Sequence, residues 1–176
     1  MTAINRNPPS QNQLQSNKFQ VLFPRISSAT YFCQSFSLPS LRASATTQTT
    51  PFVDLPRPSD KLNYGEFSMT FIVDEELWGW QIIHDWLRGY TFPCSFDEYK
   101  TLNRESIISM RASSPQYSDG YLEILSALNI PKFRVKFVNI FPVSLSGIEF
   151  DTTTSADQPV VATATFMYHL FNVERN

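Results

Sequence analysis

Hydrophobic and polar residues alternate with a period of two in several stretches of the chain. The clearest stretch is Glu66–Asp74, in which Phe67, Met69 and Phe71 are separated by polar residues. Successive side chains of a strand point to opposite faces, so this pattern predicts strands with one buried face. We predict further strands over residues 18–23, 30–38, 41–50, 121–127, 132–137 and 160–171.

One stretch, Glu75–Arg88, has helical spacing instead. Asp74 is suited to cap its start, and Gly89 is suited to follow its end. Its apolar residues form two rows, namely Leu77, Trp80, Ile83 and Leu87, and Trp78, Ile82 and Trp86. Such a wide apolar stripe fits a helix lying flat across a sheet, and it equally fits a helix whose second side is covered by a partner. The predicted fold is mainly β, an antiparallel β-sandwich or barrel with one flanking α-helix.

Two segments interrupt this pattern. Residues 51–60 contain three prolines, which predict a loop or an arm between strands. Residues 1–17 are rich in Asn, Gln, Ser and Pro and predict an irregular N-terminal arm, either disordered or ordered on a neighbouring subunit. For a chain of 176 residues we therefore expect a single β domain over residues 18–176.

Two strands carry an unusual polar face. In residues 41–50 one face is Leu41, Ala43, Ala45, Thr47 and Thr49, and the other is Arg42, Ser44, Thr46, Gln48 and Thr50. In residues 132–137 one face carries Lys132, Arg134 and Lys136. These three cations form either a solvated face or a stripe that pairs with acids of a neighbouring chain.

The overall charge and composition exclude several classes of protein. The net charge of −2 gives the whole chain no positive field that would attract nucleic acid or an acidic membrane. No apolar run approaches the roughly 18 residues of a membrane helix, and residues 1–17 do not resemble a secretory signal. Two cysteines, Cys33 and Cys94, are too few for a disulfide framework; we expect free thiols, with one bridge left open.

The residues that carry catalysis or bind metals are sparse. Neither His84 nor His169 has a second ligand at metal-binding spacing, and the five glycines form no phosphate-binding loop. We therefore expect no enzyme, no cofactor and no metal site. Two alternatives remain open, a monomeric β-barrel that binds a small apolar ligand and a hydrolase that uses His169 or Cys94.

The order of these features resembles the tail tube proteins of contractile-tailed bacteriophages. The resemblance covers residues 18–175 and is carried by short motifs: KFQVLFP, the Phe36-Ser37-Leu38-Pro39 strand end, KLNYGEFSMTFIVDEE before the Trp-rich helix, Gly89 to Pro93, and IFPVSL before the last strand. Its most specific parts are the entry from Phe71 into the helix and the Phe141-Pro142 turn.

The resemblance implies a structural virion protein that assembles with copies of itself. Six subunits would form a ring whose inner sheets join into one barrel, and the rings would stack head to tail into a channel for DNA ejection. The implied partners are the tail sheath, baseplate and tape-measure proteins, with DNA passing without specific binding and no membrane contact. Assembly in the host cytoplasm into the virion tail is expected. A tube-initiating baseplate protein or a tube-terminating protein of the same fold is the alternative.

The resemblance also assigns roles to residues. A channel wall of hydroxyl and amide side chains is wet and nearly neutral, so it would not hold DNA phosphates. The lumen-lining residues are then Ser44, Thr46, Gln48 and Thr50, with Arg42 near an interface. An arm to the next ring is expected at Phe52, Val53, Asp54, Leu55 and Arg57. Subunit or sheath contacts are expected at Trp78, Ile82, Trp86, Lys132, Arg134 and Lys136.

Overall fold

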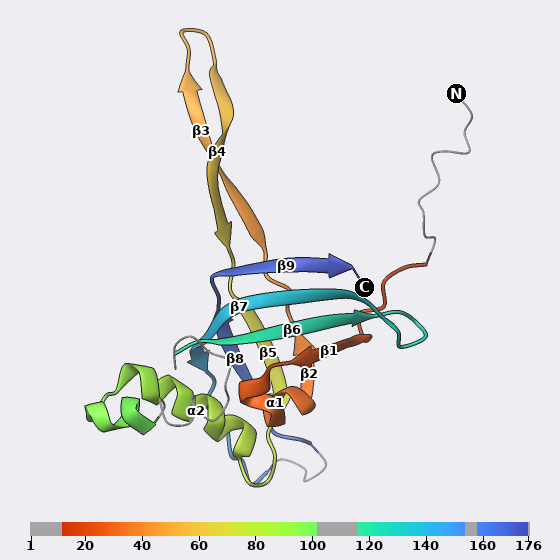
Figure 1. Ribbon diagram of the computed structural model, residues 1–176, viewed down its shortest axis with the longest axis vertical. Helices are drawn as coiled ribbons and strands as arrows, with labels where there is room; N and C mark the ends of the chain where they lie inside the picture. The colour runs from red at the N-terminus through yellow and green to blue at the C-terminus, as the bar shows by residue number, and fades with distance from the viewer. Residues whose placement is uncertain (1–11, 102–115, 154–157, 176) are drawn as a thin grey trace.

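A computed structural model describes residues 12–101, 116–153 and 158–175 of the protein. The first eleven residues of the predicted N-terminal arm lie outside the described residues. The elements in chain order are β1 (Phe19–Leu22), the short 3-10 turn η2 (Pro24–Ile26), α1 (Ser27–Tyr31), β2 (Cys33–Phe36), β3 (Leu41–Thr49), β4 (Asp54–Tyr64), β5 (Phe67–Ile72), α2 (Trp78–Thr91), β6 (Ser118–Leu125), β7 (Pro131–Leu145), β8 (Val161–Met167) and β9 (Leu170–Arg175) (Figure 1).

Seven of these strands form one bent antiparallel sheet around the core. The hydrogen-bonded order is β1-β6-β7-β8-β5-β2, and β9 pairs with β7. The first half of β7 lies between β6 and β9, and its second half, from Phe141 onward, pairs with β8. The strand changes partners next to Asn139, whose backbone has φ 56°. The predicted mainly β architecture with a flanking helix is confirmed, and α2 lies beside the sheet (Figure 1).

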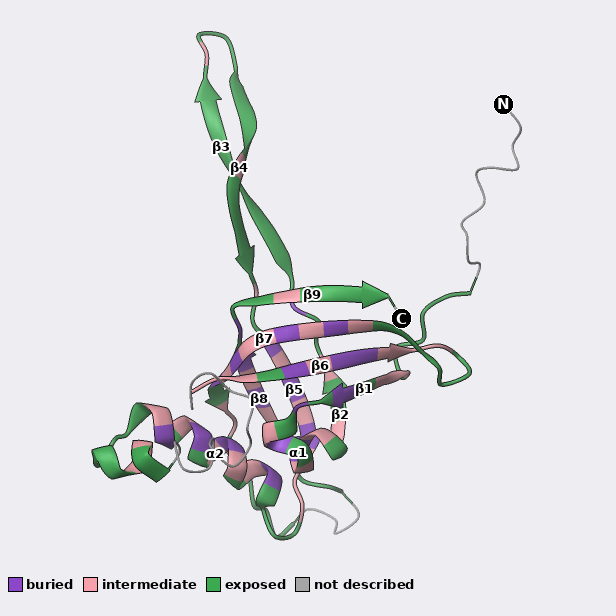
Figure 2. Ribbon diagram, viewed as in Figure 1, coloured by how far each residue is buried: buried purple, intermediate pink, exposed green. Residues whose placement is uncertain are grey.

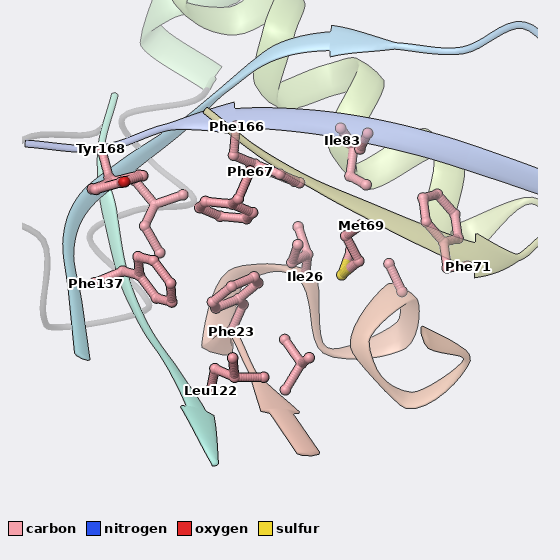
Figure 3. Close-up of a cluster of buried hydrophobic side chains, with 14 of the residues drawn as sticks. Phe23, Ile26, Phe67, Met69, Phe71, Ile83, Leu122, Phe137, Phe166 and Tyr168 are labelled. Atoms are coloured by element: carbon pink, nitrogen blue, oxygen red, sulfur yellow. The ribbon is translucent and has the colours of Figure 1, made fainter. Parts of the chain in front are cut away.

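Aromatic side chains fill the space between the two halves of the sheet (Figure 3). Phe23, Phe67, Phe137 and Phe166 are each at most 3% exposed, and the ring centroids of their contacting pairs lie 5.0–6.5 Å apart. Each such pair stabilises the fold by about 0.5–1.5 kcal/mol beyond the burial of its area. Trp86 extends this cluster from α2 onto Phe166, with centroids 6.3 Å apart.

The strand with the clearest alternation is confirmed. In β5 the side chains of Phe67, Met69 and Phe71 are buried, and the residues between them are half-buried. The last predicted strand, 160–171, is instead two strands, because the chain turns between Met167 and Leu170 and passes from β8 into β9. A short helix, α1, occupies the start of the stretch predicted as strand 30–38.

The long helix is shifted toward the C-terminus relative to the prediction. It begins at Trp78 and ends at Thr91, so Gly89 is a buried helix residue and not the residue after the helix. The backbone of Leu77 is left-handed, with φ 59°. Asp74 still acts at the helix start, because its carboxylate accepts hydrogen bonds from the N–H groups of Trp78 and Gly79, each at 3.1 Å.

Two segments that were predicted to lie outside strands belong to strands. Residues 54–60, predicted as a loop or an arm, are part of β4, and this strand does lie in an arm of the molecule. The prediction of a turn at Phe141-Pro142 is wrong, because β7 continues through these residues to Leu145, with a register shift after Pro142.

Candidate assembly surface

The hairpin made of β3 and β4 projects away from the body (Figure 1). Its strands pair only with each other, every residue of β3 is exposed, and only one residue of β4 is half-buried (Figure 2). An isolated two-stranded hairpin is marginally stable in water. A hairpin of this length therefore indicates a surface that is stabilised by contact with another molecule.

The pairing register divides the hairpin side chains between two faces. Gln48 pairs with Leu55 and Arg42 pairs with Asn63, so the members of each pair share a face, and alternation assigns their neighbours within each regularly paired stretch. The register shifts between Ala43 and Ala45, so the pairing assigns residues 59–61 to neither face. The first face, here the Ser44 face, holds Arg42, Ser44, Thr46, Gln48, Thr50, Val53, Leu55, Arg57 and Asn63. The second, the Leu41 face, holds Leu41, Ala43, Ala45, Thr47, Thr49, Asp54, Pro56, Pro58, Leu62 and Tyr64.

The four predicted lumen residues lie together on the Ser44 face. The Asn63 amide donates to the Ser44 hydroxyl at 3.4 Å, in agreement with this assignment. The structure adds one cation to this face, Arg57, which comes from the paired strand and lies opposite Thr46. Together with Arg42, the Ser44 face therefore carries two cations beside its hydroxyl and amide side chains.

Aromatic contacts tie the base of the hairpin to the body. The ring of Tyr64 lies 5.8 Å from that of Tyr168 and 5.7 Å from that of Phe171. The Tyr168 hydroxyl donates to the carbonyl of Gly65 at 2.9 Å. Burial, together with the nearby Tyr64, raises the pKa of Tyr168 to about 12, so this hydroxyl remains a donor throughout the neutral range.

The two long edges of the hairpin differ in their free backbone donors. The N–H of Thr50 donates to the carbonyl of Val53, and from this pair hydrogen-bonded and non-hydrogen-bonded pairs alternate along the hairpin. Pro56 and Pro58 lie in non-hydrogen-bonded pairs, where the backbone N–H of another residue would point away from the partner strand, and proline has no N–H. On β3 the outward positions are 41, 43, 45, 47 and 49, and none is proline. The outer edge of β3 therefore accepts a further strand more readily than the outer edge of β4.

Apolar side chains are exposed at the tip. Phe52 is 98% exposed and Val53 is 59% exposed, both at the turn. The other predicted arm residues, Asp54, Leu55 and Arg57, lie within β4.

The predicted contact row on the helix divides into exposed and buried residues. Trp78 is exposed, and its indole N–H donates to Glu76 at 2.6 Å. Ile82 is half-buried. Trp86 is only 2% exposed and packs in the subunit core, so its side chain is not available for contact with another subunit.

The three cations of β7 also differ from one another. Arg134 donates two hydrogen bonds, of 2.6 and 3.0 Å, to the Glu123 carboxylate on β6. Its acidic partner therefore lies in the same chain. Lys132 is exposed and Lys136 is half-buried, so the stripe available to a neighbouring chain is reduced to these two residues.

The described residues offer little support for catalysis. Cys33 and Cys94 are free thiols, and neither hydrogen-bonds to a histidine in the part of the chain that the structure describes. The His169 ring instead pairs with the Asn139 amide at 2.9 Å. Among residues 12–101, 116–153 and 158–175 no group of three His, Cys, Asp or Glu side chains is placed to hold a metal ion.

The alternative of an internal ligand site conflicts with the packed aromatic core. One described groove, of about 380 Å³, lies outside that core, between β1 and the segment that contains α1 and Cys33. None of the described helices is both long enough and apolar enough to span a bilayer.

Comparisons with known proteins agree with this architecture. Residues 12–174 match the family model described as phage tail tube protein. The tail tube terminator protein of Enterobacteria phage T4 is 29% identical over 171 residues, covering 94% of this chain and 91% of that protein.

Two solved structures share the fold at low sequence identity. The tube-terminating cap of the anti-feeding prophage has a TM-score of 0.61 at 12% identity, with 100% of both chains covered. A chain of the sheath–tube complex of the extracellular contractile injection system PVC, in its extended state, has a TM-score of 0.61 at 14% identity, with 94% of both chains covered. The family match spans nearly the whole chain, and so the chain belongs to the phage tail tube protein family, a family of structural tail components and not of enzymes.

Proposed function

We propose that this chain is a ring-forming subunit of the phage tail tube. Six copies assemble into a ring, and the Ser44 face of each hairpin, with Ser44, Thr46, Gln48 and Thr50, lines the channel for DNA. The observation that carries this proposal is the β3–β4 hairpin, which is exposed along its length and unpaired at both edges (Figure 2). A neighbouring copy would satisfy those edges and join the hairpins into a barrel.

Contacts along the tube axis follow from the same arrangement. The apolar tip at Phe52 and Val53 would reach the adjoining ring or another tail component. Trp78, Ile82, Lys132 and Lys136 would face a neighbouring subunit or the sheath. The PVC structure, which comes from a sheath–tube complex, supports a position inside a sheath.

A second observation favours a position at the end of the tube. The T4 relative is a tail tube terminator, and the anti-feeding prophage structure is a tube-terminating cap. We therefore place this chain in the terminal ring in preference to the shaft of the tube.

The experiment compares the wild type with a variant whose hairpin is shortened. Residues 43–62 are replaced by Asn-Gly, which joins the ladder-bonded pair Arg42 and Asn63 through a two-residue turn. The residues removed contribute no side chain to the buried core. Native mass spectrometry and negative-stain microscopy should show rings of six for the wild type and a folded monomer for the variant. A wild type that stays monomeric, or a variant that still forms rings, would contradict the proposal.

A further inference from the structure

An apolar groove lies at the end of the sheet where β6 turns into β7. Its volume is about 380 Å³, and it is lined by residues 12–15 and 124–127 together with Lys132, Phe133 and Arg175. Phe133 is paired with Ile124, which packs against the core, so both lie on the core-facing side of the sheet. Phe133 is nevertheless 37% exposed. The groove is therefore a part of the apolar sheet surface that the subunit leaves uncovered.

The side chains that border this groove are basic. Lys132 and Arg175 are both exposed. Within the part of the chain that the structure describes, neither residue forms an ion pair. The neighbouring acid, Glu174, lies opposite Arg134 and thus on the other face of the sheet. The groove therefore combines apolar surface with positive charge that the described residues leave unpaired.

The start of α2 has the opposite charge and also exposes an aromatic ring. Residues 74–87 contain four acids and no lysine or arginine. Glu75 and Glu76 are exposed in the turn before the helix. Asp85 is exposed two turns into the helix, on the same side as Trp78, which is 57% exposed. We call these four residues the acidic face of α2; among the described residues, no lysine or arginine pairs with its acids.

The groove and the acidic face of α2 lie on opposite sides of the body (Figure 1). The β6–β7 turn and the end of β9 are at the right of the view, and α2 is at the lower left. In a ring of identical subunits, every lateral contact joins two different surfaces, one from each side of the subunit. Two surfaces of complementary charge on opposite sides of one subunit meet this requirement.

We propose that the groove of one subunit receives the acidic face of α2 from the next subunit of the ring. This inference rests on the proposed function, because the two surfaces meet only when subunits form a closed ring. Trp78 enters the apolar groove, and Lys132 and Arg175 face the acids of α2. Buried Trp and Arg side chains often dominate the energy of such contacts, and complementary charges determine which surfaces pair. The contact thus sets the head-to-tail orientation of neighbouring subunits.

The test exchanges charges between the two surfaces. The groove variant is Lys132→Glu with Arg175→Glu, and the helix variant is Glu75→Lys with Asp85→Lys. The combined variant carries all four changes and so regains the wild-type net charge of −2. Sedimentation velocity over a series of protein concentrations measures the ring fraction, and thermal unfolding checks that each variant folds.

A control variant separates net charge from specific pairing. It adds Glu66→Lys and Glu149→Lys to the groove variant, which also restores the net charge of −2. Both of these acids are exposed and lie outside the groove and the acidic face of α2.

We expect the groove variant and the helix variant to weaken ring formation to a similar extent. Each reversal replaces attraction by repulsion, so each variant should need about tenfold more protein than the wild type to reach the same ring fraction. The combined variant should return close to the wild type, because the charges are again complementary. The control variant should stay as weak as the groove variant.

Three results would overturn the inference while wild-type rings persist. The first is a groove variant that assembles like the wild type. The second is a helix variant that does so, which would assign the acidic face of α2 to another partner such as the sheath. The third is a combined variant that assembles no better than the control variant. A wild type that forms no rings contradicts the proposed function itself, and this inference is then wrong as well.

Discussion

Gly120 on β6 is the residue whose missing side chain matters most for the core. A Cβ added there would lie 1.9 Å from Cδ1 of Phe23 and 2.3 Å from its Cε1. Phe23 is enclosed by other rings and cannot move away easily. We expect Gly120→Ala to lower the free energy of unfolding by about 1–3 kcal/mol, measured by urea denaturation. Gly147→Ala is the control: nothing lies within 4 Å of its added Cβ, and a comparable destabilisation there would contradict the argument.

The two cysteines should differ sharply in reactivity. Burial raises the pKa of the Cys33 thiol to about 11, whereas the thiol of Cys94 is on an exposed residue. The thiolate is the reactive form, so at pH 8 only about one Cys33 in a thousand is ionised. Iodoacetamide followed by peptide mass spectrometry should therefore modify Cys94 first, with the rate at Cys33 rising as the pH approaches 11. Equal rates in the folded protein at pH 8 would show that Cys33 is not protected.

Local alternation predicted burial well wherever a strand has one face on the core. Phe67, Met69 and Phe71 of β5, and Ala162 and Phe166 of β8, are buried as expected. Burial was harder to predict on the helix, because Trp78 and Trp86 belong to the same apolar row of the sequence. Trp86 alone is buried, since Phe166 and the carbonyl of Gln116 lie beside it, and those contacts come from distant parts of the chain.

At the scale of elements, the unequal edges of the hairpin predict which strand carries ring assembly. Thr47 sits directly opposite Pro56, and its N–H faces outward from β3. Thr47→Pro removes that donor without removing a ladder bond within the hairpin, so the subunit should fold normally and form rings poorly. Analytical ultracentrifugation measures the ring fraction, and thermal unfolding of the monomer checks the fold.

Asp54→Pro is the matched control for this prediction. It removes an outward N–H from β4, at an edge where Pro56 and Pro58 already lack donors. We expect its ring fraction to stay close to that of the wild type. An equal decrease of the ring fraction in both variants would mean that the two edges contribute alike.

The hairpin also shows what a single sequence leaves undetermined. Alternation in residues 41–50 grouped Ser44, Thr46 and Gln48 on one face, and the pairing register agrees with that grouping. The prolines of residues 51–60 argued against a strand, but an edge strand tolerates proline wherever the missing N–H would face outward. Arg57 was therefore left out of the predicted channel lining, because only its pairing with Thr46 brings it onto the Ser44 face.

At the scale of the whole molecule, the position of the subunit in the tail determines how far assembly should proceed. A shaft subunit must bind an identical ring on both sides, and a repeating head-to-tail contact that does not close produces an open polymer. A terminal subunit needs a stacking surface on one side only. The position that we propose for this chain, in the terminal ring, is the second case.

We therefore expect the purified protein to form rings that do not grow into tubes. In sedimentation velocity, the ring should appear as one boundary whose coefficient stays constant as the protein concentration rises, because all lateral edges are used once the ring closes and no second stacking surface remains. In negative stain, the same samples should show isolated rings. The hairpin-shortened variant is the control for lateral closure and should sediment as a monomer throughout. Tubes that lengthen with concentration would instead assign the chain to the shaft, and they would show that both ring surfaces bind further copies.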